Sequence, residues 1–246
     1  MDKYDLVINL VGCKEFYTTD NNAARSEDSD TALKLGEVTL RGWLGHKNIR
    51  IVYPKETLDE KISEVLNIIN ETLSLKQIKR QEKYLVDLKN SDIESISSKS
   101  TVFDIVQTYL MSSEGEERRL RKVILGEDIS YYFSVFKVSE TGKKTIVSEK
   151  KIERKIYDSL LEFRDKTRED IVKKRYYFVS DGEYLHLDIF DGDDEIGILE
   201  INVNRGFRMH IPNELKVIDK VSGNKEYSNR NLAKKGAMAS MVKKYD

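Results

Sequence analysis

The sequence predicts an α+β protein in which a short α/β segment precedes a domain of antiparallel strands that closes into a barrel. Two observations carry this prediction. Between residues 6 and 73, apolar runs of strand length alternate with helical patterns, which is typical of α/β architecture. From about residue 76 onward, strand patterns follow one another with turn signals between them. A set of about eight antiparallel strands favours closure into a barrel.

The N-terminal segment begins with two strand patterns and ends with a helix. The run Leu6–Val11 is apolar throughout, the pattern of an interior strand buried on both faces of a parallel sheet. A second apolar strand is predicted over Ile49–Tyr53. Thr57 and Glu60 form a capping box ahead of apolar residues at helical spacing, so a helix is predicted over Thr57–Leu73.

The remainder of the chain is predicted to hold mainly strands. These cover Glu82–Leu88, Val106–Leu110, Arg118–Leu125, Tyr131–Val138 and Lys143–Ile152, with three more inside Lys173–Val203. Between them the sequence predicts a surface loop with at most a short helix over Ser91–Ser100 and a helix over Glu153–Phe163. We therefore predict domains over residues 1–75 and 76–236 and a flexible tail over 237–246.

The stretch from residue 173 to residue 203 suggests the function. In its middle strand, apolar residues alternate at period two with His186 and Asp188, so one face is apolar and the other is polar. Lys173 and Arg175 alternate in the same way in the preceding strand, and Glu200 stands on the following one. Cations and carboxylates from neighbouring strands are thus expected to share one surface.

More cations stand on the other predicted strands. The complete set predicted to bind phosphate is Lys83, Arg119, Arg121, Lys137, Lys173 and Arg175. Inside a closed barrel, such cations repel one another unless an anionic ligand is bound. Arginine offers paired donors to phosphate oxygens, and Asp188 and Glu200 are the predicted ligands of Mg²⁺ or Mn²⁺. The alternative is an ordinary two-layer sheet with these charges on its solvated face.

Composition narrows the class of partner. The 42 basic and 43 acidic residues leave a formal net charge of −1, so no overall field attracts nucleic acid, and no nucleic-acid partner is predicted. A single cysteine, Cys13, excludes an intrachain disulfide and fits a reducing compartment. No apolar run approaches the roughly 20 residues of a membrane helix. These observations predict a cytoplasmic protein.

Several stretches match a known superfamily in order and spacing. They are KYLV (Lys83–Val86), QTYL (Gln107–Leu110), ERRLRK (Glu117–Lys122), KKRYYF (Lys173–Phe178), LDIF (Leu187–Phe190), GILEINV (Gly197–Val203) and VSGNKEYSNRNLA (Val221–Ala233). With them, the second domain resembles the CYTH superfamily of triphosphate tunnel proteins, which includes thiamine triphosphatases and one class of adenylate cyclases. The resemblance implies a tunnel of antiparallel strands that binds phosphorylated ligands.

The first domain carries a second resemblance, on EFYTTDNNAARSE, on WLGH and on the capped helix. It is similar to the closing part of a nucleotide-kinase-like P-loop domain, which is fused to such a tunnel in the photoreceptor translocation-defect protein subfamily. This implies binding of GTP, or of a phosphoinositide headgroup with peripheral membrane contact. It also places Arg25 as a lid residue over a nucleotide, an exposed helix cation being the alternative.

The phosphate-cradling loop of a P-loop domain is missing, since neither GxxxxGK[ST] nor GxGxxG occurs in the chain. Kinase activity is therefore not predicted. A sheet that lacks its first strands leaves an unpaired edge, which favours association with a partner chain that completes it. A fragment and a split gene are the alternatives.

The acids of the superfamily's ExExK signature are also replaced. Aligned on Lys83, Lys79 and Gln81 stand where glutamates belong, and Asn202 replaces the second glutamate of the later pair. We therefore predict a regulatory protein with a degenerate catalytic metal site. Its predicted function is binding of a nucleoside triphosphate such as GTP or ATP, or of a phosphoinositide headgroup. The alternatives are an Mg²⁺- or Mn²⁺-dependent triphosphatase acting on an inorganic or organic triphosphate, and a regulatory subunit.

Overall fold

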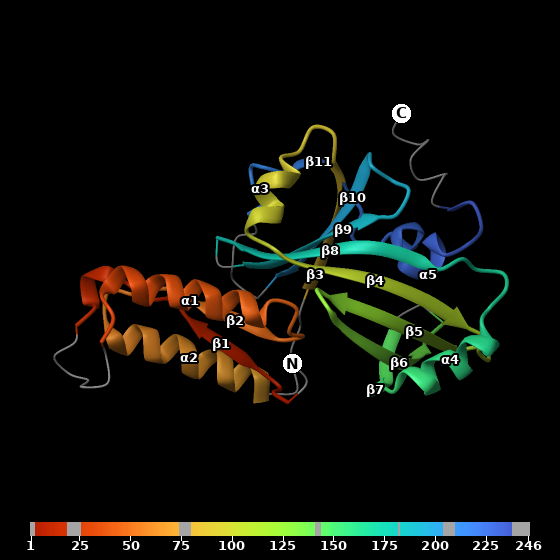
Figure 1. The fold of residues 1–246 in the computed structure, drawn as a ribbon, viewed down its shortest axis with the longest axis horizontal. Coiled ribbons are helices and arrows are strands. Elements are labelled where there is room, and N and C mark those ends of the chain that lie inside the picture. Colours follow the sequence, from red (N-terminus) through yellow and green to blue (C-terminus); the bar gives the residue numbers. More distant parts are fainter. Residues whose placement is uncertain are drawn as a thin grey trace.

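Among the described residues, nine strands form one antiparallel sheet, and two further strands form a small parallel sheet beside it (Figure 1). The computed structural model describes residues 3–18, 26–73, 80–140, 144–181, 183–203 and 210–237. Within that part the chain is a mixed α+β protein, as predicted. Arg25, the predicted lid residue, and Lys79 lie outside the described residues.

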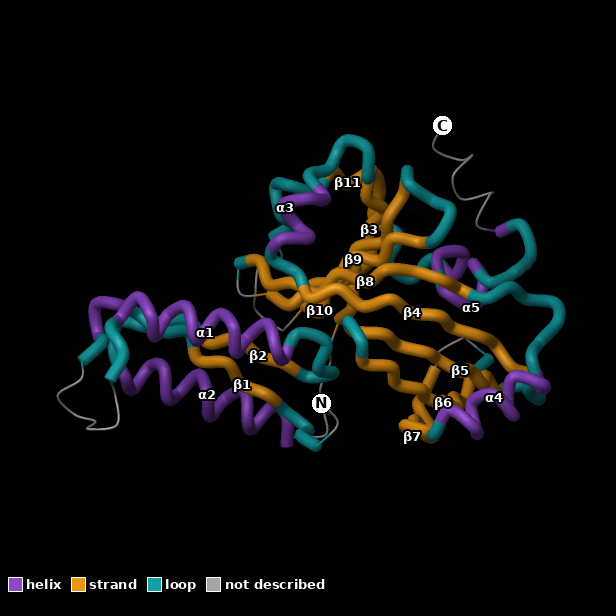
Figure 2. The backbone as a smooth tube through the Cα atoms, viewed as in Figure 1, coloured by secondary structure: helices purple, strands orange, loops and turns teal. Residues whose placement is uncertain are grey.

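The small sheet and two helices make up the N-terminal segment (Figure 2). Its elements are β1 (Val7–Leu10), the 3-10 helix η1 (Lys14–Phe16), α1 (Ser29–Trp43), β2 (Ile49–Val52) and α2 (Leu58–Leu73). The predicted capping box is present before α2, because Thr57 Oγ1 accepts from the Glu60 amide at 3.2 Å and Glu60 Oε2 accepts from the Thr57 amide at 3.4 Å.

The prediction of a strand buried on both faces is wrong for β1. The strand does pair in parallel with β2, with Val7 opposite Ile49. However, none of its residues is buried, and Leu10 is 55% exposed. The physical reason is that only two strands of this sheet lie in the described part of the chain, so no neighbour covers the other edge of β1. The predicted P-loop origin of this segment stays a prediction.

The N-terminal segment contacts the large sheet at the turn after α1. The Gly45 amide donates to Tyr184 Oη at 2.8 Å, and Thr101 Oγ1 donates to the Arg41 carbonyl at 3.0 Å. Gly45 has a φ of +100°, and a Cβ built on it would lie 2.6 Å from the ring of Phe103. Glycine is required here both by the backbone conformation and by the close approach of the ring.

The large sheet runs from β11 at one edge to β7 at the other. In spatial order its strands are β11 (Lys216–Lys220), β3 (Arg80–Asp87), β10 (Ile196–Val203), β9 (Glu183–Phe190), β8 (Ile171–Ser180), β4 (Thr101–Leu110), β5 (Glu116–Leu125), β6 (Asp128–Val138) and β7 (Lys144–Ile152). Its accompanying helices are α3 (Ile93–Ser98), α4 (Arg154–Leu160), η2 (Leu161–Phe163), η3 (Lys225–Tyr227) and α5 (Asn229–Leu232). Every pairing of neighbouring strands is antiparallel.

The predicted closed barrel is wrong, because β11 and β7 do not pair with each other. In the described part each has a single strand partner, β3 for β11 and β6 for β7. Figure 1 shows these two edges at opposite ends of the sheet. The sequence indicates how many strands there are and that they alternate. Closure depends on twist and shear along the whole sheet, which alternation within single strands does not determine.

One face of the sheet is apolar over its central strands. Leu185, Leu187, Leu199 and Phe178 are fully buried there, and Ile96 of α3 packs over them. The period-two pattern read from the middle strand is thereby confirmed, since these leucines alternate with His186 and Asp188 on the opposite face. The predicted short helix in the Ser-rich loop is α3. It covers this core and lies away from the charged residues.

The opposite face, called here the charged face, carries the cations and carboxylates of β3, β10, β9, β8 and β5. Part of this face is also apolar. Residues such as Ile198 and Phe190 form a second core with the C-terminal segment, which contributes Tyr227 and Leu232. The charged face is therefore covered over part of its length and polar over the rest. No helix in the described part is both long and apolar enough to span a membrane.

Candidate functional site

Strand register brings the predicted charged residues of four central strands together. Arg175 of β8 lies opposite Asp188 of β9, and Glu200 of β10 lies opposite both His186 of β9 and Lys83 of β3. Directly opposed side chains on one face are close enough to interact. With Lys173 these five residues make up a group that we call the buried cluster: Lys83, Lys173, Arg175, His186, Asp188 and Glu200.

Asp188 is the centre of the buried cluster, and both of its oxygens are engaged by cations. Arg175 donates from Nε to Oδ1 at 2.6 Å and from Nη2 to Oδ2 at 2.7 Å. Lys173 donates from Nζ to Oδ2 at 2.5 Å. The side chains of Lys173 and Asp188 are each only 2% exposed. A two-donor arginine contact combined with a lysine contact holds this carboxylate in one geometry.

Two donors hold Glu200 in a similar way, and His186 lies beside it. Lys83 Nζ lies 2.5 Å from Oε1, and Gln81 donates from Nε2 to Oε2 at 2.6 Å. Nε2 of His186 lies 3.1 Å from the same Oε2. Gln81, which the predicted resemblance aligns with a glutamate, thus acts as a hydrogen-bond donor to Glu200. Asn202 of β10 lies opposite Gln81 in the strand pairing.

Burial and charge pairing shift the ionisation of this cluster. Burial lowers the pKa of Lys173 to about 8, although Asp188 attracts its charge. Burial opposes the charge of Asp188, but Arg175 and Lys173 outweigh it and hold its pKa far below the usual range. Burial, with Arg175 adding to it, lowers the pKa of His186, so the imidazole is uncharged at neutral pH. Asp188 therefore stays ionised at neutral pH beside two cations.

A second group of charges lies on β5, β6 and β7, and we call it the edge cluster: Arg119, Arg121, Ser134 and Glu149. A single oxygen, Glu149 Oε2, is its centre. It accepts from Arg121 Nη2 at 2.8 Å and from Ser134 Oγ at 2.8 Å, and it lies 3.9 Å from Arg119 Nη2. Across the strands Arg119 lies opposite Ser134, which lies opposite Glu149. Two arginines thus share one carboxylate.

Aromatic rings orient the two arginines. The guanidinium of Arg119 lies 4.5 Å from the ring centre of Phe136, and that of Arg121 lies 5.6 Å from that of Tyr132. The Nε atoms of both arginines are buried and have no hydrogen-bond partner. A buried donor without a partner is costly, and an anion is the natural acceptor for a guanidinium.

The edge cluster and the buried cluster lie on the same face, on either side of β4. In the strand order β5 is followed by β4 and then β8, so two inter-strand spacings, roughly 10 Å, separate β5 from β8. Arg121 and Arg175 are also offset along the strands, because they lie opposite Gln107 and Phe103 of β4. On this face β4 contributes Phe103, Ile105 and Gln107, all buried and uncharged. The charged face thus presents two cationic groups separated by a neutral strip.

Lys137, one of the six predicted phosphate ligands, is not brought to this face. It is exposed and lies opposite Glu116 and Thr145. Side chains on β6 that share the face of Arg119 are Ser134 and Phe136, so Lys137 points to the other side. The hairpin of β5 and β6 has a two-residue turn that sets Leu125 opposite Asp128, and this register fixes which residues share a face.

Sequence reasoning missed Ser134 and Glu149, and it placed His186 on the polar face of its strand without assigning it a role. The structure places His186 inside the buried cluster, at 5% exposure. The sequence did indicate this position, because His186 alternates with Asp188 on one strand. Glu149 carried no such signal. Its place beside Arg121 depends on the register between β6 and β7, which shifts between Val135 and Phe136.

A resident metal ion is a poor fit to the carboxylates of the buried cluster. One ligand atom each from His186, Asp188 and Glu200 lie within 4.8 Å of one another, so a donor set is present. However, both carboxylates are already paired with the three cations Lys83, Lys173 and Arg175. Two further positive charges would be uncompensated in this buried place unless an anion came with them. An ion that arrives bound to a polyphosphate meets that condition.

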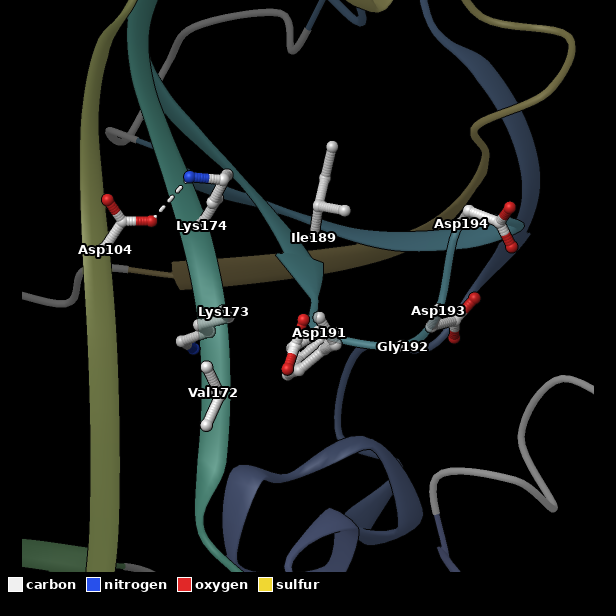
Figure 3. A pocket seen from close by; sticks show the side chains of 10 residues that line it. Asp104, Val172, Lys173, Lys174, Ile189, Asp191, Gly192, Asp193 and Asp194 are labelled. Carbon is white, nitrogen blue, oxygen red and sulfur yellow. Dashed lines mark hydrogen bonds and ion pairs between the residues drawn. The ribbon is translucent and has the colours of Figure 1, made fainter.

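A cavity of about 680 Å³ lies beside β8 and β9, lined by Asp104, Lys174, Ile189 and the turn 191–194. Figure 3 shows Lys174 turned toward Asp104, with which it forms an ion pair at 2.7 Å. Asp193 closes the turn, because its Oδ1 accepts from the Ile196 amide at 3.0 Å. The charged residues of its lining are Asp104, Asp191, Asp193 and Asp194 against Lys173 and Lys174, and this excess of acids does not suit an anion.

No protein-family model matches the chain, and no curated protein matches it. Among solved structures, it is similar to the hypothetical protein NE1496, with 23% identity, a TM-score of 0.44 and coverage of 63% of this chain and 97% of that chain. A second structure, named the inorganic triphosphatase NE1496, has 21% identity and a TM-score of 0.44, and the match covers 63% of this chain and 93% of that chain. The PH1819 protein from Pyrococcus horikoshii OT3 has 15% identity and a TM-score of 0.37, and the match covers 51% of this chain and 80% of that chain. TM-scores below 0.5 do not establish a family, so membership of the CYTH superfamily stays a prediction.

Proposed function

We propose that the charged face binds a ligand with several phosphate groups, either a nucleoside triphosphate such as GTP or ATP or a phosphoinositide headgroup, in a regulatory role. One observation carries the proposal. Five cations of the two clusters face three carboxylates, which leaves an excess of two positive charges on a largely buried surface. Such an excess is stabilised by an anion.

The arrangement of the donors supports a phosphorylated ligand in particular. Arginines already oriented by aromatic rings present planar pairs of donors, which match phosphate oxygens. The two clusters lie on either side of β4 and are also offset along the strands, so a ligand that reaches both must carry its negative charges at separate points. Lys83 and Lys173 add single charges to the buried cluster.

Isothermal titration of GTP, ATP, inorganic triphosphate and an inositol phosphate headgroup tests the proposal. We expect heat from at least one ligand, and binding about tenfold or more weaker in Arg121→Gln, which removes a charged donor. Arg118→Gln is the matched control. It removes the same charge from the same strand, but Arg118 pairs with Glu116 on the opposite face. Folded protein that gives no heat with any of the four ligands overturns the proposal.

Triphosphate hydrolysis is the second candidate, favoured by the convergence of His186, Asp188 and Glu200. The test is phosphate release from inorganic triphosphate with Mg²⁺ or Mn²⁺ present. Release that is lost in both Asp188→Ala and Glu200→Gln, with each variant shown to be folded, supports hydrolysis. Turnover equal to that of buffer removes this candidate and leaves binding as the function.

A further inference from the structure

The edge cluster contains a carboxylate where its arginines converge, and this Glu149 is more exposed than Asp188, Glu200 and Glu117, which also lie on the charged face. Glu149 Oε2 receives two donors and lies near a third, from Arg121, Ser134 and Arg119. This is the arrangement expected around one oxygen of a bound phosphoryl group. Glu149 therefore occupies the position in which a ligand oxygen would satisfy both arginines.

We propose that Glu149 is a built-in competitor of the ligand, so that a phosphorylated ligand must displace this carboxylate to bind Arg119 and Arg121. The inference rests on the proposed function and adds regulation of the same site. It follows from two facts already described. The arginines have a single shared counter-ion, and that counter-ion comes from β7, the edge strand of the sheet.

The position of β7 makes displacement of Glu149 easier than displacement of Asp188. The Glu149 side chain is 36% exposed, whereas that of Asp188 is 2% exposed. In the described part β7 pairs only with β6, and most of its residues are exposed. A register irregularity lies beside the residue that holds Glu149, between Val135 and Phe136. A partly exposed carboxylate on an edge strand can itself turn into water at little cost, provided that a ligand takes its place beside the arginines.

The arginines, in contrast, stay in place when Glu149 leaves. Phe136 and Tyr132 lie against their guanidinium groups, and the side chains of Arg119 and Arg121 are 19% and 22% exposed. Burial lowers the pKa of Arg119, with the charge of Arg121 adding to that shift. Two neighbouring cations that lose their shared carboxylate repel each other, and a multiply charged phosphate is the stronger replacement.

Titration of inorganic triphosphate into the wild type and Glu149→Gln tests this. We expect binding about tenfold or more tighter in the variant, because glutamine keeps the shape of the side chain but loses the competing charge. Glu116→Gln is the matched control. It removes the same charge and also breaks a pair with an arginine, Arg118, but on the opposite face. Glu116→Gln is expected to bind as the wild type does.

The outcomes separate the two proposals. Equal or weaker binding in Glu149→Gln than in the wild type overturns the competitor role and leaves the proposed function intact. Failure of both proteins to bind overturns the proposed function itself. Should Glu149→Gln not fold, Glu149→Asp keeps the charge and shortens the side chain, so it competes less well. Binding in Glu149→Asp tighter than in the wild type then supports the proposal, and unchanged binding overturns it.

Discussion

The two clusters of the charged face use the same residue types in opposite ways. In the buried cluster, three cations meet two carboxylates on central strands, and the carboxylates are 2% and 10% exposed. In the edge cluster, two arginines share the one carboxylate of Glu149, which is partly exposed. Burial makes the first cluster a structural requirement of the sheet, whereas exposure leaves the second free to exchange its counter-ion.

The largest expected effect is on stability, from Asp188→Asn. This change leaves Lys173 and Arg175 buried without their counter-ion, so we expect the free energy of unfolding to fall by about 3–5 kcal/mol. Urea unfolding at neutral pH measures it. Asp104→Asn is the control, because its pair with Lys174 is exposed, with an expected loss of about 0–1 kcal/mol. A loss in Asp188→Asn no larger than in the control contradicts the structural role of the buried cluster.

An effect of intermediate size is expected on triphosphate affinity when the pH is raised. Burial lowers the pKa of Lys173 to about 8, so this lysine loses its charge as the pH rises through that value. Triphosphate affinity should then fall by about tenfold between pH 7 and pH 9.5, as one charged donor is lost. Isothermal titration across this range checks it. The ligand's own titration is removed by comparison with Lys173→Met, in which the same decline should be absent.

The same ionisation also affects folding, with a definite sign. The pKa of Lys173 is lower in the folded protein than its usual value of about 10.4. Between about pH 8 and 10.4 the unfolded chain therefore binds more protons, and this lysine makes the free energy of unfolding rise with pH. Subtracting the pH dependence of Lys173→Met from that of the wild type isolates this contribution. A difference that falls across the window contradicts the assignment.

The smallest expected effect is the coupling between Arg121 and Glu149. A double-mutant cycle with Arg121→Gln and Glu149→Gln should give about 1 kcal/mol or less, because one partner is over one third exposed. The matched cycle of Arg175→Gln and Asp188→Asn should give a larger value, since both groups are buried. Equal coupling energies in the two cycles would remove the distinction between the clusters.

Much of the fold was predictable, because the local periodicity of apolar residues indicates the strands and the capped helix. The predicted strand over Tyr131–Val138 corresponds to β6, which begins at Asp128, and the helix over Thr57–Leu73 corresponds to α2. The prediction of a closed barrel failed for lack of long-range information. So did the prediction of a fully buried β1, whose burial depends on neighbours in the sheet.

The candidate site was only partly predictable, for a related reason. Arg175, Asp188 and Glu200 lie on consecutive strands of short hairpins, so alternation alone places them on one face. To predict the face of Lys137, one must know the number of residues in the turn between β5 and β6. To predict the neighbours of Glu149, one must know the irregular register between β6 and β7. Neither is visible in the alternation of a single strand.

The sequence by itself determined which side chains alternate on each strand, the number of charges available and the absence of a phosphate-cradling loop. Only the tertiary structure decided which of those charges meet. Side-chain period is a property of one strand, but a counter-ion is set by strand order, register and depth of burial. For that reason Asp188 lies deep among its cations, while Glu149 stands at an edge where a ligand can compete with it.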